Sequence, residues 1–260
     1  MAGNALITGA GRRLGRAMAL YLAGRGIDVA LHYASSRTEA EATASQVRAL
    51  GARAVTLPAD LLDEAATTGL IPAASEALGG PLTVLINNAS IFEYDTVHSA
   101  TLSSWNRHMG SNLRAPFVLT QGFAAQALQA GEDVYGEPLA AGLIVNMIDQ
   151  RVRKLTPEFM TYTIAKMGLW AMTQTTAQAL APHIRVNAIG PGPTLQGERQ
   201  SAQHFNRQRA NTVLKRGANA PDITAALGYF LDAPAVTGQL LCVDGGQHLG
   251  WQTPDILGVE

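Results

Sequence analysis

Tyr162 and Lys166 stand four residues apart in the segment T-Y-T-I-A-K-M-G-L-W, and Asp149 lies thirteen residues before the tyrosine. Residues four apart share one face of a helix, so an ammonium group there lies beside a phenol. Such a neighbour stabilises the phenolate and lowers the pKa of the phenol, which lets a tyrosine act as an acid near neutral pH. The spacing alone also fits a solvated lysine beside a half-buried tyrosine, so the catalytic interpretation depends on the rest of the chain.

The elements that would position these groups follow from a regular alternation along the chain. Short β-type runs alternate with longer helical stretches, which is typical of a parallel sheet wrapped by helices. We expect strands at residues Ala5–Thr8, Val29–Tyr33, Ala54–Leu57, Thr83–Asn87, Leu143–Asn146, Arg185–Ile189 and Leu240–Val243. We expect helices at residues Leu14–Arg25, Glu39–Leu50, Glu64–Leu78, Leu102–Gln129, Phe159–Leu180 and Asp222–Leu231. The sequence therefore predicts an α/β fold with a doubly wound, Rossmann-type sheet of seven parallel strands and helices on both faces.

The composition fits a single domain spanning residues 1–260. A chain of 260 residues with 47% hydrophobic and 15% charged residues can bury a large core. The formal net charge of -1 creates no field that attracts nucleic acid or an anionic membrane, and no run reaches the ~18 apolar residues of a spanning helix. We therefore expect a small-molecule substrate, with no nucleic-acid or membrane partner. The first residues show no basic segment followed by a long apolar run, so we expect no secretion signal.

The cysteine and histidine content narrows the chemistry further. Cys242 is the single cysteine, which excludes an internal disulfide and suits a reducing cytoplasm. It lies in an apolar run, so we expect a small core residue there. The six histidines show no metal-ligand spacing with cysteine or acidic residues, so we expect no bound metal.

Two stretches lack a regular pattern. Residues Gly131–Ala141 are expected to form a solvated loop, and residues 191–217 a mobile flap, because a Gly/Pro-rich start leads into a polar Gln/Arg-rich body. We expect the flap and the tail from His248 to Glu260 to shape the mouth of a substrate pocket. Trp251 is expected to pack in the core or at a subunit boundary, with a cover over the site as the alternative.

A glycine-rich turn follows the first predicted strand. It reads T-G-A-G-R-R-L-G over Thr8–Gly15 and leads directly into a helix. Glycines let the backbone turn tightly and approach a pyrophosphate, and the free amides and dipole of the helix stabilise negative charge. The turn therefore indicates a dinucleotide site, with a merely structural turn as the alternative.

The second predicted strand indicates which dinucleotide binds. Enzymes that prefer NAD usually carry an acid at the tip of this strand, which holds the ribose hydroxyls and would repel a 2'-phosphate. Here the tip reads His32-Tyr33-Ala34-Ser35-Ser36-Arg37, without an acid. Arg12, Ser36 and Arg37 can supply charge and hydrogen bonds to a phosphate, which favours NADPH. The alternative for Arg37 is an exposed residue in the first turn of a helix.

Taken together, these residues resemble the short-chain dehydrogenase/reductase family over nearly the whole chain. The matching motifs are the glycine turn, Asp60-Leu61, Asn87-Asn88-Ala89, Asn112, the Tyr162/Lys166 pair, Pro191-Gly192 and V-D-G-G at Val243–Gly246. The resemblance implies hydride transfer from a nicotinamide, Asp60 at the adenine, Asn88 in the cofactor cleft, Asn112 supporting Lys166 in a proton relay, and a homotetramer. The cofactor-binding residues expected from the turn, the second strand and the resemblance are Gly9, Gly11, Arg12, Arg13, Leu14, Gly15, His32, Tyr33, Ser36, Arg37, Asp60, Leu61, Asn88, Ala89, Ser90, Pro191 and Gly192.

Two positions depart from the common family pattern. Arg13 stands where the turn usually has a further glycine, and Asp149 stands where the catalytic serine is usual, with no serine anywhere between Asn112 and Gln200. Both replacements are similar to those of the pteridine reductases. That branch also has H-Y after the second strand and N-N-A-S with an aromatic two residues on, as in His32-Tyr33, Asn87-Asn88-Ala89-Ser90 and Phe92 here.

This resemblance implies a pterin substrate, a flat heterocycle that suits an aromatic platform and a few oriented polar groups. The expected substrate-binding residues are Arg13, Ser90, Phe92, Asp149 and Tyr162. We expect hydride to add to a ring carbon and Tyr162 to protonate the adjacent nitrogen. Asp149 would support that transfer, while Lys166 lowers the Tyr162 pKa and binds the nicotinamide ribose.

Each assignment has an alternative. Phe92 could be a core aromatic, Ser90 a turn residue, and Arg13 a residue of the turn without a substrate role. Asp149 could be a loop acid paired with Arg151 or Arg153, which would leave a carbonyl or alcohol oxidoreductase on another substrate. A non-catalytic NADP-sensing protein is a further alternative, which the intact catalytic pair and Asn112 oppose.

Overall fold

The computed structural model describes residues 3–197 and 200–251, and within them seven parallel strands form one sheet. The strands are β1 (Gly3–Ile7), β2 (Ile27–Tyr33), β3 (Ala54–Pro58), β4 (Leu82–Asn87), β7 (Gly142–Met147), β8 (Ile184–Pro191) and β9 (Leu240–Val243). Their order is β3-β2-β1-β4-β7-β8-β9, so the strand order turns back between β1 and β4. Each predicted strand is found within three residues of its expected bounds.

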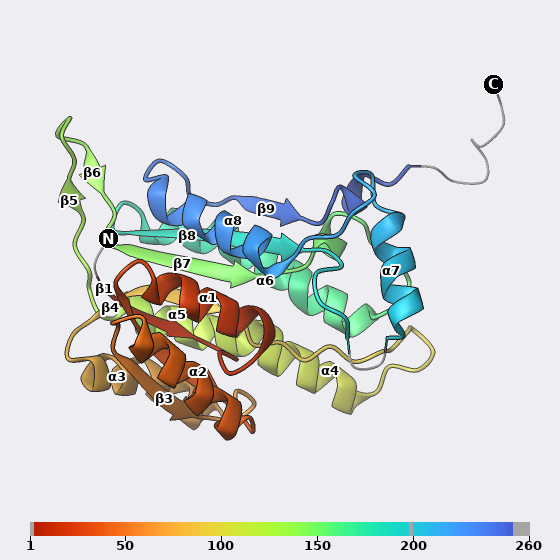
Figure 1. The fold of residues 1–260 in the computed structure, drawn as a ribbon, viewed down its shortest axis with the longest axis horizontal. Coiled ribbons are helices and arrows are strands. Elements are labelled where there is room, and N and C mark those ends of the chain that lie inside the picture. Colours follow the sequence, from red (N-terminus) through yellow and green to blue (C-terminus); the bar gives the residue numbers. More distant parts are fainter. Residues whose placement is uncertain (1–2, 198–199, 252–260) are drawn as a thin grey trace.

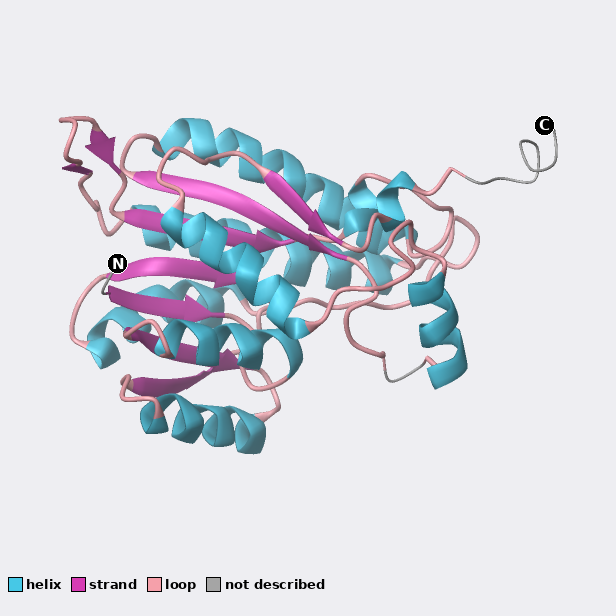
Figure 2. Cartoon of the chain, turned by 45° about the horizontal axis from the view of Figure 1, so that its top comes forward, coloured by secondary structure: helices cyan, strands magenta, loops and turns pink. Residues whose placement is uncertain are grey.

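Helices cover both faces of this sheet (Figures 1 and 2). Successive side chains of a strand point to opposite faces, so Ala5 and Ile7 of β1 join one core and Leu6 joins the other. The first core lies under α1 (Arg13–Ala23), α2 (Arg37–Ala49) and α8 (Ala220–Asp232). The second lies under α3 (Glu64–Leu78), α5 (Ala115–Ala124) and α6 (Met160–Leu180). The doubly wound α/β prediction is confirmed.

The long helix predicted at Leu102–Gln129 is interrupted. The structure has α4 (Leu102–Met109), then a π-helical turn (Gly110–Arg114), and then α5, which ends at Ala124. A π-helical turn inserts residues without breaking the helical run, so an apolar pattern read along the sequence does not reveal it. Such turns are often found at functional sites, and this one contains Asn112.

Both segments predicted to be irregular contain regular structure. The segment Gly131–Ala141 forms a small hairpin of β5 (Gly131–Glu132) and β6 (Pro138–Leu139), whose strands are too short to show a periodic pattern. The flap contains α7 (Ala202–Ala210), capped by Ser201 accepting the His204 N–H at 3.1 Å. No residue of α7 is buried, so its sequence lacks the apolar stripe on which a prediction depends.

Two smaller expectations concern the burial of Cys242 and Trp251. Cys242 is half-buried rather than in the core, and burial raises the pKa of its thiol to about 11. Trp251 is 64% exposed in the chain, so it is not a core residue, and the remainder of the predicted tail, 252–260, lies outside the described residues. Within the described ranges, no helix is long and apolar enough to cross a membrane, and no cluster of three or more His, Cys, Asp or Glu could hold a metal.

Candidate active site

A cavity of about 660 Å³ lies at the carboxyl edge of the sheet, next to the point where the strand order turns back. It is lined by the glycine turn after β1, by residues at the ends of β2, β4, β7 and β8, and by residues of α6 and α7. In Figure 1, the arrows of β7, β8 and β9 point toward the side on which α7 lies. Ligands of doubly wound sheets bind in this crevice, so the fold brings the nucleotide end and the catalytic end into one cavity.

The glycine turn is shaped by contacts that exclude side chains. Gly9 has a φ of +64°, and a Cβ on Gly15 would lie 2.2 Å from the Gly9 carbonyl oxygen. His32 is buried and accepts the Gly9 N–H at 3.1 Å through Nδ1, which leaves Nε2–H to donate to the Ala59 carbonyl at 3.0 Å. Burial lowers the His32 pKa and keeps the ring neutral, as this pair of bonds requires. His32 therefore acts on the cofactor end by holding the turn.

The start of α1 offers donors to a phosphate group. The first amides of a helix lack intrahelical partners and carry the positive end of its dipole. Arg12, the N-cap residue, makes no side-chain capping bond, and the first turn contains no acid. Arg13, Leu14 and Gly15 of this turn line the cavity. The residues present therefore fit the pyrophosphate of a nicotinamide dinucleotide.

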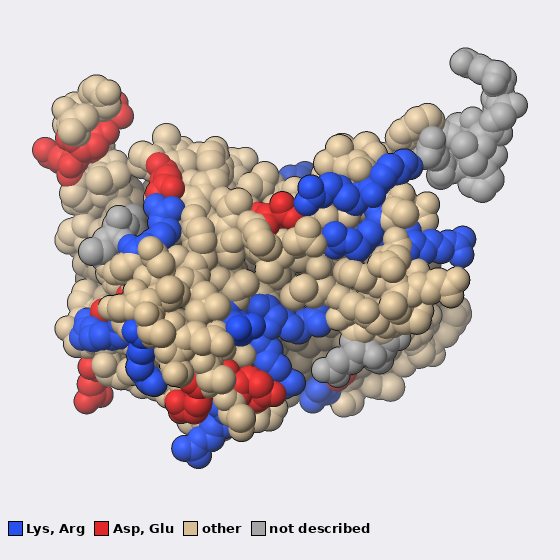
Figure 3. Space-filling view, in the orientation of Figure 1, with Lys and Arg blue, Asp and Glu red and all other residues tan. Residues whose placement is uncertain are grey.

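One of the two arginines predicted at the 2'-phosphate lies at the cavity. Arg12 and Ser36 line it, whereas Arg37 begins α2 on the exposed surface and does not. Arg12 Nη1 lies 3.5 Å from Glu39 Oε1, and both side chains are exposed. Such a pair is worth less than about 1 kcal/mol, so a phosphate can displace the carboxylate. Figure 3 shows a group of Lys and Arg side chains on the face between α1 and α7, two of the helices that contribute residues to the cavity.

The predicted catalytic groups meet at the start of α6. Tyr162 and Lys166 are both buried there, and the Tyr162 hydroxyl donates to Asp149 Oδ2 at 3.0 Å. The other oxygen of Asp149 accepts the Arg151 N–H at 2.8 Å, which fixes the carboxyl group. Lys166 Nζ donates to the Met147 carbonyl at 2.8 Å and lies 5.7 Å from the centre of the Tyr162 ring. Asp149 is therefore bonded to the tyrosine and is not a loop acid paired with a nearby arginine side chain.

Burial moves each of these groups toward its neutral form. Burial, and then the Asp149 carboxylate, raise the Tyr162 pKa well above its usual value. Burial raises the Asp149 pKa, and burial lowers the Lys166 pKa to about 8. The expectation that Lys166 lowers the Tyr162 pKa is wrong for this structure, because the ammonium group is held by a carbonyl and desolvation of the phenol dominates. At neutral pH Tyr162 is thus a protonated phenol, suited to donate rather than to accept.

Asn112 serves the site in a different way from the one expected. Its Oδ1 accepts the Ile91 N–H and its Nδ2 donates to the Ile91 carbonyl, both at 2.8 Å. The side chain therefore fixes the backbone of the segment after β4, next to Phe92. Lys166 takes its hydrogen bond from Met147 instead, so the expected relay from Asn112 to Lys166 is not seen among the side-chain contacts of the described residues.

An aromatic cluster borders the catalytic group. Phe92 stacks on Phe159 with ring centres 4.3 Å apart and planes 6° apart, and it meets Tyr162 edge-on at 4.7 Å. Phe92 is 44% exposed and lines the cavity, so it is not an ordinary core aromatic. Ser90 also lines the cavity, and a hydrogen bond from its side chain partly offsets the rise in the Tyr162 pKa.

Arg13 holds the flap at the cavity. Its φ of +53° lies in the left-handed region, which explains why glycine suits this position. The guanidinium donates to the carbonyls of Gln196 at 2.8 Å and Leu195 at 3.0 Å. Arg13 therefore joins the phosphate turn to the segment that leads into α7, in addition to lining the cavity.

Most of the predicted site residues line the cavity. Those that do are Gly9, Arg12, Arg13, Leu14, Gly15, His32, Tyr33, Ser36, Asp60, Leu61, Asn88, Ala89, Ser90, Phe92, Asp149, Tyr162, Lys166, Pro191 and Gly192. Gly11, Arg37 and Asn112 do not; Gly11 instead packs against α2, where a Cβ would lie 3.0 Å from the Ala40 nitrogen.

Sequence reasoning missed several lining residues, among them Gln150, Arg151, Phe205, Gln208 and Gln247. Arg151 Nε is buried without a hydrogen-bond partner in the described part of the chain, while its guanidinium lies 5.0 Å from the centre of the Phe159 ring. These residues sit on 3₁₀ turns of three residues and on a helix without a buried face, so no periodic pattern or motif marks them.

Known proteins are similar to this chain over most of its length. The family described as Enoyl-(Acyl carrier protein) reductase matches residues 9–248. A short-chain dehydrogenase/reductase of Armillaria gallica is 31% identical, over 93% of this chain and 94% of its own.

Two solved structures are similar over nearly the whole chain. FolM alternative dihydrofolate reductase 1 from Brucella suis, in complex with NADP, is 43% identical, covers 98% of each chain and has a TM-score of 0.89. A short-chain dehydrogenase from Burkholderia cenocepacia, in complex with NADP, is 30% identical, covers 94% of this chain and 96% of its own, and has a TM-score of 0.82.

Proposed function

Since the chain belongs to the short-chain dehydrogenase/reductase family and is an NADPH-dependent oxidoreductase, we propose that its substrates are pterins. The substrate class comprises dihydropterins or oxidised pterins such as biopterin, with dihydrofolate as a further substrate. The reaction is the reduction of a ring C=N bond.

The observation that carries this proposal is the 3.0 Å hydrogen bond between Tyr162 and Asp149, at a position where the family usually has serine. A serine hydroxyl can polarise a ketone but does not ionise at neutral pH. A carboxyl group with a raised pKa can hold a proton and pass it on. Reduction of either C=O or C=N ends with a proton on the heteroatom, but a ring nitrogen is more basic than a ketone oxygen, so a carboxyl group that can supply a proton suits reduction of the C=N bond.

The residues of the chain then have distinct tasks. NADPH, when bound, supplies the hydride to a ring carbon of the substrate. Tyr162 Oη donates its proton to the adjacent ring nitrogen, and Asp149 returns a proton to Tyr162 Oη along their hydrogen bond. Lys166 carries a positive charge below about pH 8, and its ammonium group is held at the Met147 carbonyl. Lys166 also binds the nicotinamide ribose.

Recognition of the flat substrate falls to residues beside the proton donor. Phe92 offers an aromatic surface within the cavity, and its ring centre lies 4.7 Å from that of Tyr162. Ser90 and Arg13 line the same cavity and supply polar groups to it. Aromatic contact gives affinity for a heterocycle, and the few polar groups fix its orientation.

The similarity to FolM alternative dihydrofolate reductase 1 supports this substrate class. That protein's name describes the reduction of dihydrofolate, and dihydrofolate contains a pterin ring. At 43% identity over 98% of both chains, the two proteins share the whole fold.

The test is a substrate panel with the purified protein. NADPH oxidation is followed by its near-ultraviolet absorbance with dihydrobiopterin, dihydromonapterin, dihydrofolate and a set of ketones, and each rate is compared with that of Tyr162→Phe. We expect the pterins to be reduced with much higher kcat/KM than any ketone. Turnover of ketones alone would contradict the pterin assignment and support a carbonyl reductase. No turnover of any compound, together with tight NADPH binding, would support a sensor.

A further inference from the structure

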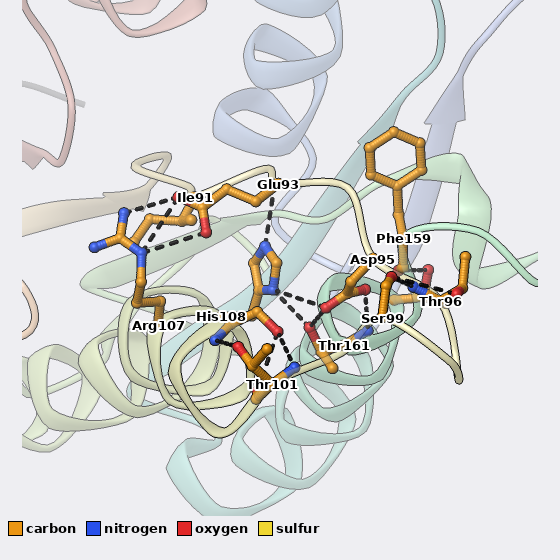
Figure 4. Close-up of polar contacts among 12 residues, drawn as sticks. Ile91, Glu93, Asp95, Thr96, Ser99, Thr101, Arg107, His108, Phe159 and Thr161 are labelled. Atoms are coloured by element: carbon orange, nitrogen blue, oxygen red, sulfur yellow. Dashed lines mark hydrogen bonds and ion pairs between the residues drawn. The ribbon is translucent and has the colours of Figure 1, made fainter.

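A chain of buried polar groups lies behind the aromatic cluster and joins three elements (Figure 4). Asp95 lies on the segment that follows β4, His108 lies on the last turn of α4, and Thr161 lies on the first turn of α6. Their side chains are 2%, 0% and 2% exposed, respectively. Buried polar groups destabilise a fold unless they have hydrogen-bond partners, so the loss of any hydrogen bond in this series would lower the stability of the protein.

The hydrogen bonds run in one direction. The Glu93 N–H donates to His108 Nε2 at 3.1 Å, so the proton of the neutral ring must lie on Nδ1. That Nδ1–H donates to Thr161 Oγ1 at 2.7 Å, and the Thr161 hydroxyl donates to Asp95 Oδ2. Burial lowers the His108 pKa, which keeps the ring in the neutral form that this order requires. Figure 4 shows the ring between Glu93 and Thr161, with Asp95 beyond.

The same aspartate caps the catalytic helix. Phe159, at the N-cap position of α6, has a φ of +54° and makes no side-chain capping bond. Asp95 replaces that cap from a distant segment: its Oδ1 accepts the Thr161 N–H at 3.1 Å and its carbonyl accepts the Met160 N–H at 3.3 Å. A carboxylate at this end of a helix is also favoured by the helix dipole.

Two members of this series of hydrogen bonds are sequence neighbours of active-site residues. Glu93 directly follows Phe92, and Thr161 directly precedes Tyr162. The His108 ring also meets the Tyr162 ring edge-on, with centres 6.0 Å apart. A shift of any link therefore changes the position of Phe92 relative to Tyr162, which are the aromatic surface and the proton donor.

We propose that His108, Thr161 and Asp95 are positioning residues that hold the segment carrying Phe92 against the start of α6. In this way they fix the separation between the aromatic surface and the Tyr162 hydroxyl. The part that concerns Phe92 rests on the proposed pterin substrate, whereas the positioning of Tyr162 does not. None of the three residues touches the reacting atoms, and none lines the cavity.

The first test compares Thr161→Val with Thr161→Ser. Valine keeps the shape but leaves His108 Nδ1–H and Asp95 Oδ2 without their partner, while serine keeps the hydroxyl. The matched control is Thr173→Val on the same helix. Thr173 is also fully buried, and its hydroxyl donates to the Leu169 carbonyl at 2.8 Å and accepts from Asn146 at 2.9 Å.

We expect Thr161→Val to lower kcat with dihydrobiopterin by about 10- to 100-fold, because small misplacements of reacting groups have effects of this size. NADPH affinity, measured by fluorescence titration, should stay unchanged, and Thr161→Ser should restore most of the rate. Thr173→Val should lower the thermal midpoint without this loss of kcat. Equal losses of kcat in Thr161→Val and Thr173→Val would overturn the proposal.

The second test needs no substrate and uses the wild-type chain. Nitrogen NMR of the histidine rings should show His108 protonated at Nδ1 and bare at Nε2, and the amides of Glu93 and Thr161 should exchange slowly with solvent. A His108 ring protonated at Nε2, or rapid exchange of both amides, would overturn the proposal. If the wild type reduces no pterin, the proposed function fails; the kinetic comparison is then made with a ketone that it reduces, and the NMR test decides in either case.

Discussion

Replacing Asp149 separates its two tasks, because the carboxyl group both accepts a hydrogen bond and can deliver a proton. Asp149→Asn keeps the shape and one acceptor oxygen, which can take the Arg151 N–H, while its NH₂ group then faces Tyr162 Oη as a donor, and it has no acidic proton to give. Asp149→Ala removes the whole carboxyl group. Asp149→Ser restores the residue that is usual in the family and keeps a short acceptor for the Arg151 amide.

The structure sets the size of the effects. In Asp149→Ala, the buried Tyr162 hydroxyl loses its acceptor at 3.0 Å and the Arg151 amide loses its acceptor at 2.8 Å. An unpaired buried polar group costs about 1–3 kcal/mol, and removal of a buried carboxyl group with a raised pKa returns part of this. We expect a net loss of about 2 kcal/mol, which lowers the melting temperature of a chain of this size by roughly 4–8 °C. Asp149→Asn should melt close to the wild type.

The Asp149 variants should rank differently in kcat than in melting temperature. Loss of a general acid commonly lowers the rate by ~10²- to 10⁴-fold, so both Asp149→Asn and Asp149→Ala should lose pterin turnover by such a factor. Asp149→Ser should lose pterin turnover and gain relative activity on ketones. The assay is steady-state NADPH oxidation on dihydrobiopterin and a ketone panel, with NADPH affinity as the control. An Asp149→Asn variant with wild-type kcat would refute the role in proton delivery.

The proposed role of Asp149 also predicts how kcat changes with pH. Burial raises the Asp149 pKa, so the protonated carboxyl group persists to higher pH than in a solvated aspartate. If that form delivers the proton, kcat falls as the pH rises through the Asp149 pKa. Asp149→Asn has no such group, so its low residual kcat should not show this fall. A fall of equal depth in both proteins would assign the titration to another residue.

Four further outcomes are expected. Tyr162→Phe should lower kcat by ~10²- to 10⁴-fold with little change in the fluorescence titration of NADPH, because only the donated proton is lost. Arg12→Glu should weaken NADPH by about 10-fold or more and leave NADH nearly unchanged in the same titration, since a charged hydrogen bond is worth ~1.5–3 kcal/mol. Because the Lys166 pKa is about 8, NADPH affinity should weaken above that pH as the ammonium group loses its proton, and Lys166→Arg should not show this loss. Burial lowers the pKa of both His32 and His108, so the unfolded chain binds more protons and the thermal midpoint should fall as the pH drops below about 6.5.

The part of the site that could be predicted from the sequence depends on short-range rules. Tyr162 and Lys166 share a face because a helix has a fixed period, and the glycine turn needs residues that only a few types can supply. Asp149 follows a strand whose neighbours end at the same edge, so its arrival beside the tyrosine follows from the parallel sheet. Each of these groups is placed by local structure and strand order alone.

The remaining features depend on tertiary contacts that leave no local trace. Asp95 and Thr161 are 66 residues apart in the chain, and His108 reads as an ordinary polar residue at the end of a helix. The Lys166 ammonium group could reach either the tyrosine or a carbonyl, and only the packed structure selects Met147. Arg13 is predicted from the sequence as a residue of the cofactor turn that contacts the substrate, but its guanidinium donates to carbonyls of the flap.

Two aspartates act on neighbouring residues of the same helix, and their environments give them opposite properties. Burial would raise the Asp95 pKa, but hydrogen bonds from the Thr161 hydroxyl and amide and from Ser104, together with the nearby His108, outweigh it, and the net pKa is lowered. Asp149 accepts one amide and the Tyr162 hydroxyl, and for it burial dominates, so its pKa is raised. Asp95 therefore stays ionised and caps α6 over a wide pH range, while Asp149 is the group able to carry a proton. Two carboxyl groups whose pKa values are shifted in opposite directions suit separate structural and acid roles, which supports the proposed role of Asp149 in proton delivery.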